Sequence, residues 1–113
     1  MIIDLFSGAG GLSLGFEMAG FNVGVSVEME ENLNCTNAKN LPDCASINAS
    51  VTELDKQQVR KNHLDGQKVL GIIGGPPCQG FSTVGNRKED DPRNLLVFEF
   101  LNWVEFFQPE FFV

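Results

Sequence analysis

The chain has 113 residues, of which 42% are hydrophobic, and it carries 8 Lys and Arg against 15 Asp and Glu. This length allows one domain, the composition is that of a folded globular chain, and no apolar run approaches the roughly 18–20 residues needed to span a bilayer. The N-terminus lacks the basic and apolar regions of a signal peptide, and the three cysteines form no CxxC pair. We therefore expect a reduced cytoplasmic protein with neither a disulfide framework nor a metal site.

The net charge of −7 does not decide whether nucleic acid is a partner. Residues 1–55 carry eight acids and a single base, Lys39, whereas residues 56–113 carry seven of each. Phosphate contacts need Lys and Arg, so a uniformly acidic chain would speak against DNA. Because all of the excess acid lies in the first half, the total charge excludes no partner.

The first 27 residues predict a strand, a glycine-rich turn, a helix and a second strand. Residues 1–5 form a short apolar run that stops at the turn 7–11. Beyond the turn, Leu12, Phe16 and Ala19 recur at helical spacing and predict a helix, which Gly20 is placed to end in the left-handed conformation. Residues 21–27 carry a valine at alternate positions and suit a strand.

The middle of the chain continues the alternation. A helix is predicted over residues 30–40, where few apolar positions are periodic, and a short strand over 45–48. Thr52 is placed to cap a helix over 53–63, whose Lys and Arg side chains indicate a solvated face. The single histidine, His63, is expected to be a solvated residue at the end of that helix.

The last part of the chain predicts a buried strand at 69–73, a polar loop at 79–93 and a helix at 94–107. Pro109 separates this helix from an apolar run at 110–113, which indicates a fifth strand cut in the middle of a domain; a short C-terminal edge strand is the alternative. Strands alternating with helices imply right-handed βαβ units. The predicted fold is a Rossmann-like, doubly wound α/β domain with a mainly parallel sheet.

The first motif, DLFSGAGG at residues 4–11, lies between the first strand and the first helix. A glycine-rich turn there lets backbone N–H groups approach a ligand closely. Glu28 follows 20 residues after Gly8, at the end of the second strand, where an acid accepts the ribose hydroxyls of a nucleoside cofactor. The third glycine of the GxGxxG fingerprint is missing, which disfavours NAD.

The second motif, GGPPCQGFS at residues 74–82, is more specific. It follows the fourth predicted strand, at the sheet edge where open α/β folds bind ligands. Two prolines fix the backbone just before Cys78, whose thiolate is a nucleophile if its surroundings lower its pKa. No motif surrounds Cys35 or Cys44, which we expect to be inert.

Together, DLFSGAGG and GGPPCQGFS, with an acid between them, closely resemble the DNA (cytosine-5-)-methyltransferase family over essentially all 113 residues. PPCQ is the discriminating piece, since amino-methylating enzymes of similar fold commonly hold an aromatic residue after the prolines. The resemblance implies S-adenosylmethionine as cofactor and, as partner, double-stranded DNA with a flipped cytosine. It also implies a prokaryotic-type enzyme of a restriction–modification or similar system.

The resemblance also assigns roles to individual residues. Cys78 is implied to add to cytosine C6, so that C5 can take the methyl group. The loop that follows is implied to assist base flipping through Gln79, Ser82, Arg87 and Arg93. The cofactor contacts that the family pattern implies are Phe6, Ser7, Gly8, Gly10, Gly11, Glu28, Met29, Ser50, Val51, Gly75, Pro77 and Leu96.

Two departures from the family stand out. The family often has Asp-Ile where this chain has Ser50 and Val51, and a serine accepts a hydrogen bond from an adenine amino group more weakly than a carboxylate does. The family's Glu-Asn-Val segment, its target-recognition region and its C-terminal helix also have no counterpart in residues 1–113. The chain is thus expected to be the N-terminal part of a catalytic domain, with a cofactor-binding turn at 4–16 and a nucleophile loop at 74–93. A missing C-terminal part or a second chain would complete the fold, and the chain alone is expected to be inactive.

Three alternatives remain open from the sequence. In the first alternative, the chain is a non-catalytic S-adenosylmethionine-binding module or a subunit of a split enzyme. In the second it belongs to an RNA cytosine-5 methyltransferase of related sequence. An NAD oxidoreductase is the most distant, disfavoured by PPCQ and by the missing glycine.

Overall fold

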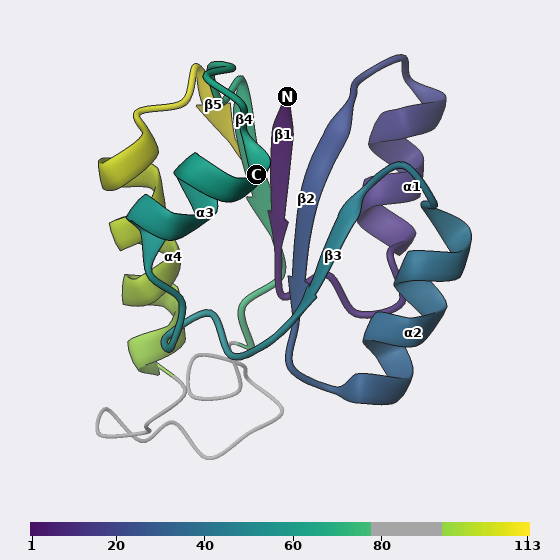
Figure 1. Cartoon of the computed structure of the whole chain (residues 1–113). Coiled ribbons are helices and arrows are strands. Elements are labelled where there is room, and N and C mark those ends of the chain that lie inside the picture. Colours follow the sequence, from purple (N-terminus) through teal and green to yellow (C-terminus); the bar gives the residue numbers. More distant parts are fainter. Residues whose placement is uncertain (78–93) are drawn as a thin grey trace.

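The structure, a computed structural model, describes residues 1–77 and 94–113 and is built around one parallel sheet (Figure 1). The strands are β1 (Ile2–Leu5), β2 (Val23–Glu28), β3 (Ala45–Asn48), β4 (Gly71–Gly74) and β5 (Phe111–Phe112), in the order β3-β2-β1-β4-β5. The helices are α1 (Gly11–Met18), α2 (Glu31–Asn40), α3 (Lys56–His63) and α4 (Asn94–Phe107). Helices α1 and α2 cover one face of the sheet, and α3 and α4 cover the other. The predicted doubly wound α/β fold is confirmed.

The order of the strands fixes where a ligand can bind. The chain places β2 and then β3 on one side of β1, and β4 and then β5 on the other. This reversal opens a crevice at the carboxyl ends of β1 and β4, the usual ligand site of open α/β sheets. The turn after β1 and the segment after β4, which carry the two sequence motifs, therefore meet at one edge.

The core lies on both faces of the sheet because every strand residue of β1 is buried and successive side chains point to opposite faces. Ile3 and Leu5 belong to a large cluster with Trp103 and other α4 side chains, whereas Ile2 belongs to a smaller cluster on the α1 face. Trp103 is fully buried. Burying side chains of this size contributes about 1.5–3 kcal/mol each, so the α4 face holds most of the hydrophobic stabilisation.

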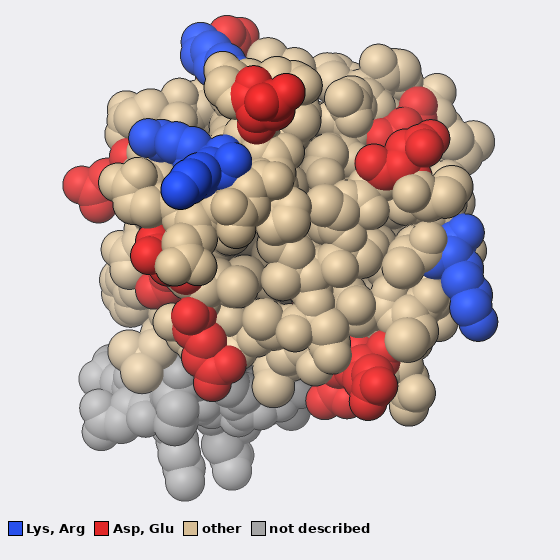
Figure 2. All heavy atoms as spheres, in the orientation of Figure 1, with Lys and Arg blue, Asp and Glu red and all other residues tan. Residues whose placement is uncertain are grey.

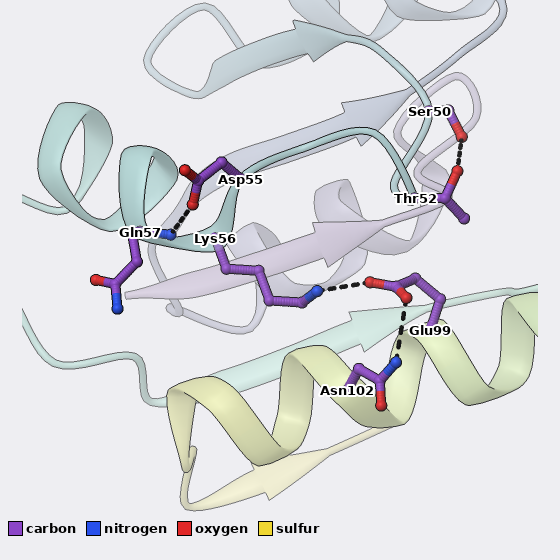
Figure 3. A network of polar contacts seen from close by, with 7 residues as sticks. All are labelled: Ser50, Thr52, Asp55, Lys56, Gln57, Glu99 and Asn102. Atoms are coloured by element: carbon purple, nitrogen blue, oxygen red, sulfur yellow. Dashed lines mark hydrogen bonds and ion pairs between the residues drawn. The ribbon is translucent and has the colours of Figure 1, made fainter.

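The predicted cap of the third helix is wrong. Asp55, not Thr52, precedes α3 and accepts a hydrogen bond from the Gln57 backbone N–H at 2.8 Å (Figure 3). Thr52 instead pairs its hydroxyl with that of Ser50 at 2.9 Å. Asp and Thr are both good helix N-caps. Asp55 is the cap here because residues 50–53 form a turn, in which the Glu53 N–H donates to the Ser50 carbonyl. The helix is shorter than predicted for this reason.

The first helix is present as predicted, but the apolar residues at helical spacing are not the ones that it buries. Leu12 and Ala19 are exposed and Phe16 is half-buried, while Ser13 is the buried residue of α1. A polar side chain faces the sheet because the strand beneath it presents the carboxylate of Asp4, which accepts a hydrogen bond from the Ser13 hydroxyl at 2.5 Å. The periodicity identified the helix but not the side that it buries.

The fifth strand pairs with β4 along one side only and forms an edge of the described sheet. The Phe111 ring lies over Gly71, where an added Cβ would come within 2.5 Å of the ring. It also stacks on Phe16, with ring centroids 6.2 Å apart. None of the described helices is long and apolar enough to cross a membrane.

Candidate functional site

The glycine-rich turn after β1 is held in a conformation that few residues adopt. Phe6, Gly8 and Gly10 all have positive φ angles, of 59°, 56° and 90°. For a residue with a bulky side chain this conformation is an outlier that the surrounding structure must enforce, and such outliers gather at functional sites. The turn is closed by a hydrogen bond from the Gly10 N–H to the Ser7 carbonyl at 3.0 Å.

Glu28 ties this turn to the end of β2. One carboxylate oxygen accepts the Gly8 N–H at 2.9 Å and the other accepts the Glu30 N–H at 2.8 Å. The side chain is only 8% exposed, so its orientation is fixed. A carboxylate has about four acceptor positions, and two of them stay available to the hydroxyl groups of a ligand.

Asp4 lies directly beneath the turn and is fully buried in β1. The pKa of its carboxyl is raised from 3.8 to about 6, chiefly by burial and to a smaller extent by the nearby Glu28, while the hydrogen bonds with Ser13 act in the opposite direction. Its Oδ1 atom is buried without a hydrogen-bond partner among the described residues. Helix α1 is thus held to the strand by one oxygen of a carboxylate that is costly to ionise.

A cleft of about 250 Å³ opens beside the turn, at the carboxyl ends of the strands. Its volume is near the small end of ligand pockets, which measure about 300–1,000 Å³. Phe6 and Glu28 contribute from the β1 and β2 ends, and Leu96 contributes from α4. The residues that line it are Phe6, Val27, Glu28, Met29, Glu30, Ala49, Ser50, Val51, Gly75, Pro77 and Leu96.

Most of the predicted cofactor contacts lie together in this cleft. They come from five separate parts of the chain: Phe6, Glu28, Met29, Ser50, Val51, Gly75, Pro77 and Leu96. The other four, Ser7, Gly8, Gly10 and Gly11, form the adjoining turn and do not line the cleft itself. Val27, Glu30 and Ala49 line it without having been predicted, although each is next in sequence to a residue that was.

The GGPPC segment enters the site through a close contact between strands. At Gly74, an added Cβ would lie 2.1 Å from the backbone oxygen of Leu5, so only glycine fits there. Gly75 and Pro77 then extend into the cleft. Cys78 follows Pro77 in the sequence but lies outside the described residues, as do Gln79, Ser82, Arg87 and Arg93.

The cysteines and the histidine that were expected to have no role in the site do not line this cleft. Cys35 is exposed and Cys44 is half-buried, and burial raises the pKa of the Cys44 thiol. His63 is the last residue of α3 and is not a cleft residue. Among residues 1–77 and 94–113, no group of three or more His, Cys, Asp and Glu side chains is placed to hold a metal ion.

Sequence reasoning missed Asn37, which is fully buried on α2 and hydrogen-bonded to the turn. The available signal was indirect. The helix over 31–40 has few apolar positions, so something other than hydrophobic contact had to hold it to the sheet. A single asparagine among several in that helix gave no indication of which one is buried.

The surface shown in Figure 2 is electrostatically mixed. On this face the Lys and Arg side chains of the described residues stand singly or in one small group, and acidic side chains lie between them. A protein that binds DNA through its phosphates needs a basic stripe or patch. This face of the described residues supplies none.

Comparison with known proteins gives consistent matches over the whole chain. A family model described as C-5 cytosine-specific DNA methylase matches residues 1–113. The type II methyltransferase M.DdeI of Desulfomicrobium norvegicum is 47% identical over 112 residues, which cover 99% of this chain and 26% of that protein. The type II methyltransferase M1.HphI of Haemophilus parahaemolyticus is 47% identical over 114 residues, 98% of this chain and 30% of that protein.

A solved structure gives the same result. A prophage-encoded protein from E. coli, described as a DNA modification methyltransferase, superposes with a TM-score of 0.82 at 43% identity. The match covers 98% of this chain and 30% of that one. The chain therefore spans about a quarter to a third of the length of the relatives that it matches.

Proposed function

We propose that this chain, which belongs to the C-5 cytosine-specific DNA methylase family, forms the part of such an enzyme that binds S-adenosylmethionine and carries the nucleophile. The proposed reaction transfers the methyl group to C5 of a cytosine in DNA. The relatives are type II methyltransferases, so a restriction–modification system in the bacterial cytoplasm is the proposed setting. The observation that carries the proposal is the cleft, where residues from five parts of the chain meet beside the segment that leads to Cys78.

The chemistry of the cleft fits the proposed cofactor. Glu28 offers fixed acceptor positions for ribose hydroxyls, and the apolar side chains of Phe6 and Leu96 suit the faces of a purine. Helix α1 follows Gly10 and no side chain caps it, so N–H groups of its first turn can face the carboxylate of a methionine moiety. When bound, S-adenosylmethionine supplies an electrophilic methyl group on its sulfonium.

Cys78 is the proposed nucleophile because cytosine C5 is too weakly nucleophilic to take the methyl group directly. The thiolate adds to C6, and C5 of the resulting enamine would attack the methyl carbon. The bond from that carbon to the sulfonium sulfur would break in the same step, with S-adenosylhomocysteine as the leaving group. The C5 proton then passes to a base and the C6–sulfur bond breaks, which restores the thiolate. The target base must leave the duplex first, at a cost of a few kcal/mol. Gln79, Ser82, Arg87 and Arg93 are the proposed contacts for that step.

The isolated 113-residue polypeptide is proposed to be inactive. The family's glutamate that handles the cytosine N3 proton and its target-recognition region lie outside the 113 residues, and the surface seen in Figure 2 has no basic patch among the described residues. The remaining part of the protein or a second chain is the proposed source of both. Double-stranded DNA with a flipped cytosine is the proposed partner of the completed enzyme.

A chimera tests this proposal. Residues 1–113 replace the matched segment of the Desulfomicrobium norvegicum relative, and transfer of a labelled methyl group from S-adenosylmethionine to cytosine C5 in DNA is measured. We expect the chimera to methylate DNA and the isolated chain not to. Cys78→Ser in the chimera should lower turnover by at least about 10³-fold, because an alcohol is a far weaker nucleophile than a thiolate.

Cys35→Ser is the matched control, since Cys35 is an exposed cysteine outside both motifs. It should leave turnover unchanged. Near-normal turnover of the Cys78→Ser chimera would remove Cys78 from its role. Methyl transfer by the purified 113-residue chain would contradict its proposed inactivity.

A further inference from the structure

A buried amide on α2 connects the cofactor turn to the sheet. Asn37 is fully buried, and it is the one buried residue of a helix that is otherwise mostly exposed. Burying an amide costs free energy unless its polar atoms are hydrogen-bonded. The hydrogen-bond partners of Asn37 therefore show which elements this side chain connects.

Those partners come from three different elements. The Asn37 Nδ2 donates to the Ser7 hydroxyl at 3.0 Å, in the turn after β1. Its Oδ1 accepts the hydroxyls of Ser26 on β2 and Ser46 on β3, each at 3.1 Å. One half of the amide is thus anchored to two rigid neighbouring strands, and the other half reaches the turn.

The same side chain also packs against the other end of the turn. At Gly10, an added Cβ would lie 3.1 Å from the Asn37 Nδ2, so Asn37 fills the space beside that glycine. One helical turn later, Asn40 donates to the Ala9 carbonyl at 3.1 Å. Helix α2 therefore contacts the turn at positions 7, 9 and 10.

We propose that Asn37 is a positioning residue that fixes the glycine turn in its cofactor-binding shape through Ser7. The inference rests on the proposed function, because it assigns that shape to cofactor binding. The turn does not hold itself, since Phe6 has a positive φ angle that a residue with a bulky side chain rarely adopts, and Gly8 and Gly10 are free to adopt many other conformations. The anchored amide supplies the constraint that the turn lacks.

The test uses the full 113-residue chain and calorimetric titration with S-adenosylhomocysteine. Asn37→Ala and Ser7→Ala are each expected to weaken binding by about tenfold, the effect of one lost buried hydrogen bond. The double variant should bind no more than about twofold more weakly than Asn37→Ala, because both substitutions break the same link. A purely structural role would instead make the two losses add.

Two control variants separate positioning from general stability. Ser46→Ala removes a hydrogen bond to the same Asn37 amide on the strand side, so it should lower the unfolding temperature with less than threefold loss of binding. Asn32→Ala, at an exposed position of the same helix, should change neither. If Asn37→Ala does not fold, amide exchange at Gly8 and Gly10 in Ser7→Ala against Ser46→Ala decides the question, because Ser7 is itself an expected cofactor contact and its binding loss alone does not.

Amide hydrogen exchange gives a readout that needs no cofactor. The Gly8 and Gly10 N–H groups are both hydrogen-bonded in the turn. In Asn37→Ala and in Ser7→Ala they should exchange at least about tenfold faster than in Ser46→Ala, while β1 amides exchange alike in all three.

The outcomes separate the inference from the proposed function. If the unmodified chain binds no S-adenosylhomocysteine, the proposed cofactor is contradicted. The amide exchange rates then test by themselves whether Asn37 positions the turn. Equal exchange at Gly8 and Gly10 in Asn37→Ala and Ser46→Ala, or additive losses in the double variant, would overturn the positioning role.

Discussion

At the scale of single residues, Asp4 is a buried carboxyl group beside the site whose ionisation is unfavourable. Its carboxyl is buried, one of its oxygens has no partner among the described residues, and its pKa is raised to about 6. A raised folded-state pKa means that the fold favours the protonated acid. Stability contributed by this group is therefore present at low pH and is lost as the pH rises from about 4 to about 6.

The Asp4→Asn variant tests the predicted direction of this pH dependence. Asparagine cannot ionise, so the unfolding free energy of the variant minus that of the unmodified chain should increase between pH 4 and pH 7. The shift of about two pKa units corresponds to at most about 3 kcal/mol at 1.36 kcal/mol per unit. Chemical denaturation at a series of pH values measures the difference.

Asp43→Asn, at an exposed acid, is the control for the change in net charge. Its difference from the unmodified chain should stay nearly constant across the same range. A difference for Asp4→Asn that is equally flat, or that falls with rising pH, would show that Asp4 ionises in the folded chain at least as easily as in the unfolded one.

At the scale of elements, the packing of α3 against α4 includes an ion pair shielded from water. Lys56 Nζ lies 2.7 Å from Glu99 Oε1, and the two side chains are only 22% and 18% exposed. Asn102 donates to the other Glu99 oxygen at 3.2 Å (Figure 3). Glu99 follows Leu96 by one helical turn, so this pair holds the part of α4 that lines the cleft.

A double-mutant cycle with Lys56→Met and Glu99→Gln measures the pair. Partial burial reduces solvent screening, and we expect a coupling free energy of about 1 kcal/mol. Lys68 and Glu110 form the matched control, since their 3.0 Å pair is mostly exposed, at 70% and 59%. Their coupling should be close to zero and should vanish in high salt. Equal coupling in the two cycles would contradict the assigned difference.

At the scale of the whole molecule, several apolar surfaces face solvent. Leu12 and Phe21 border a depression of about 240 Å³ along α1, and the outer side of α4 exposes Leu95, Phe98 and Leu101. The edge strand β5 adds Phe112, which is 56% exposed, beside unpaired backbone groups. Surfaces of this kind promote association, and an open strand edge is the most effective template.

The isolated chain is therefore expected to self-associate at micromolar concentration. Phe112→Lys places a charge on the β5 edge and should bring the mass measured by light scattering closer to that of one chain. Leu33→Lys puts the same charge on an exposed leucine of α2 and should leave the measured mass unchanged. An equal effect of both variants would show that net charge rather than the strand edge controls association.

How much the sequence determined can be judged from particular residues. The alternation of apolar runs gave every strand and helix in the right order, with β3 and α4 at the predicted residues and the others within a few positions. Local patterns suffice for this because helix and strand periods are properties of neighbouring side chains. The two motifs also predicted residues that meet in one cleft, since strand ends in a parallel sheet share an edge.

Only the tertiary structure decided which side chains turn inward. Ser13 is buried and Leu12 is exposed because Asp4, nine residues before Ser13, needs a hydrogen-bond donor. Asn37 is buried because serines of the turn and of two strands surround it. These choices depend on groups brought together from distant parts of the chain. A buried polar atom is satisfied by whichever partner the fold places beside it, and no local pattern in the sequence records that partner.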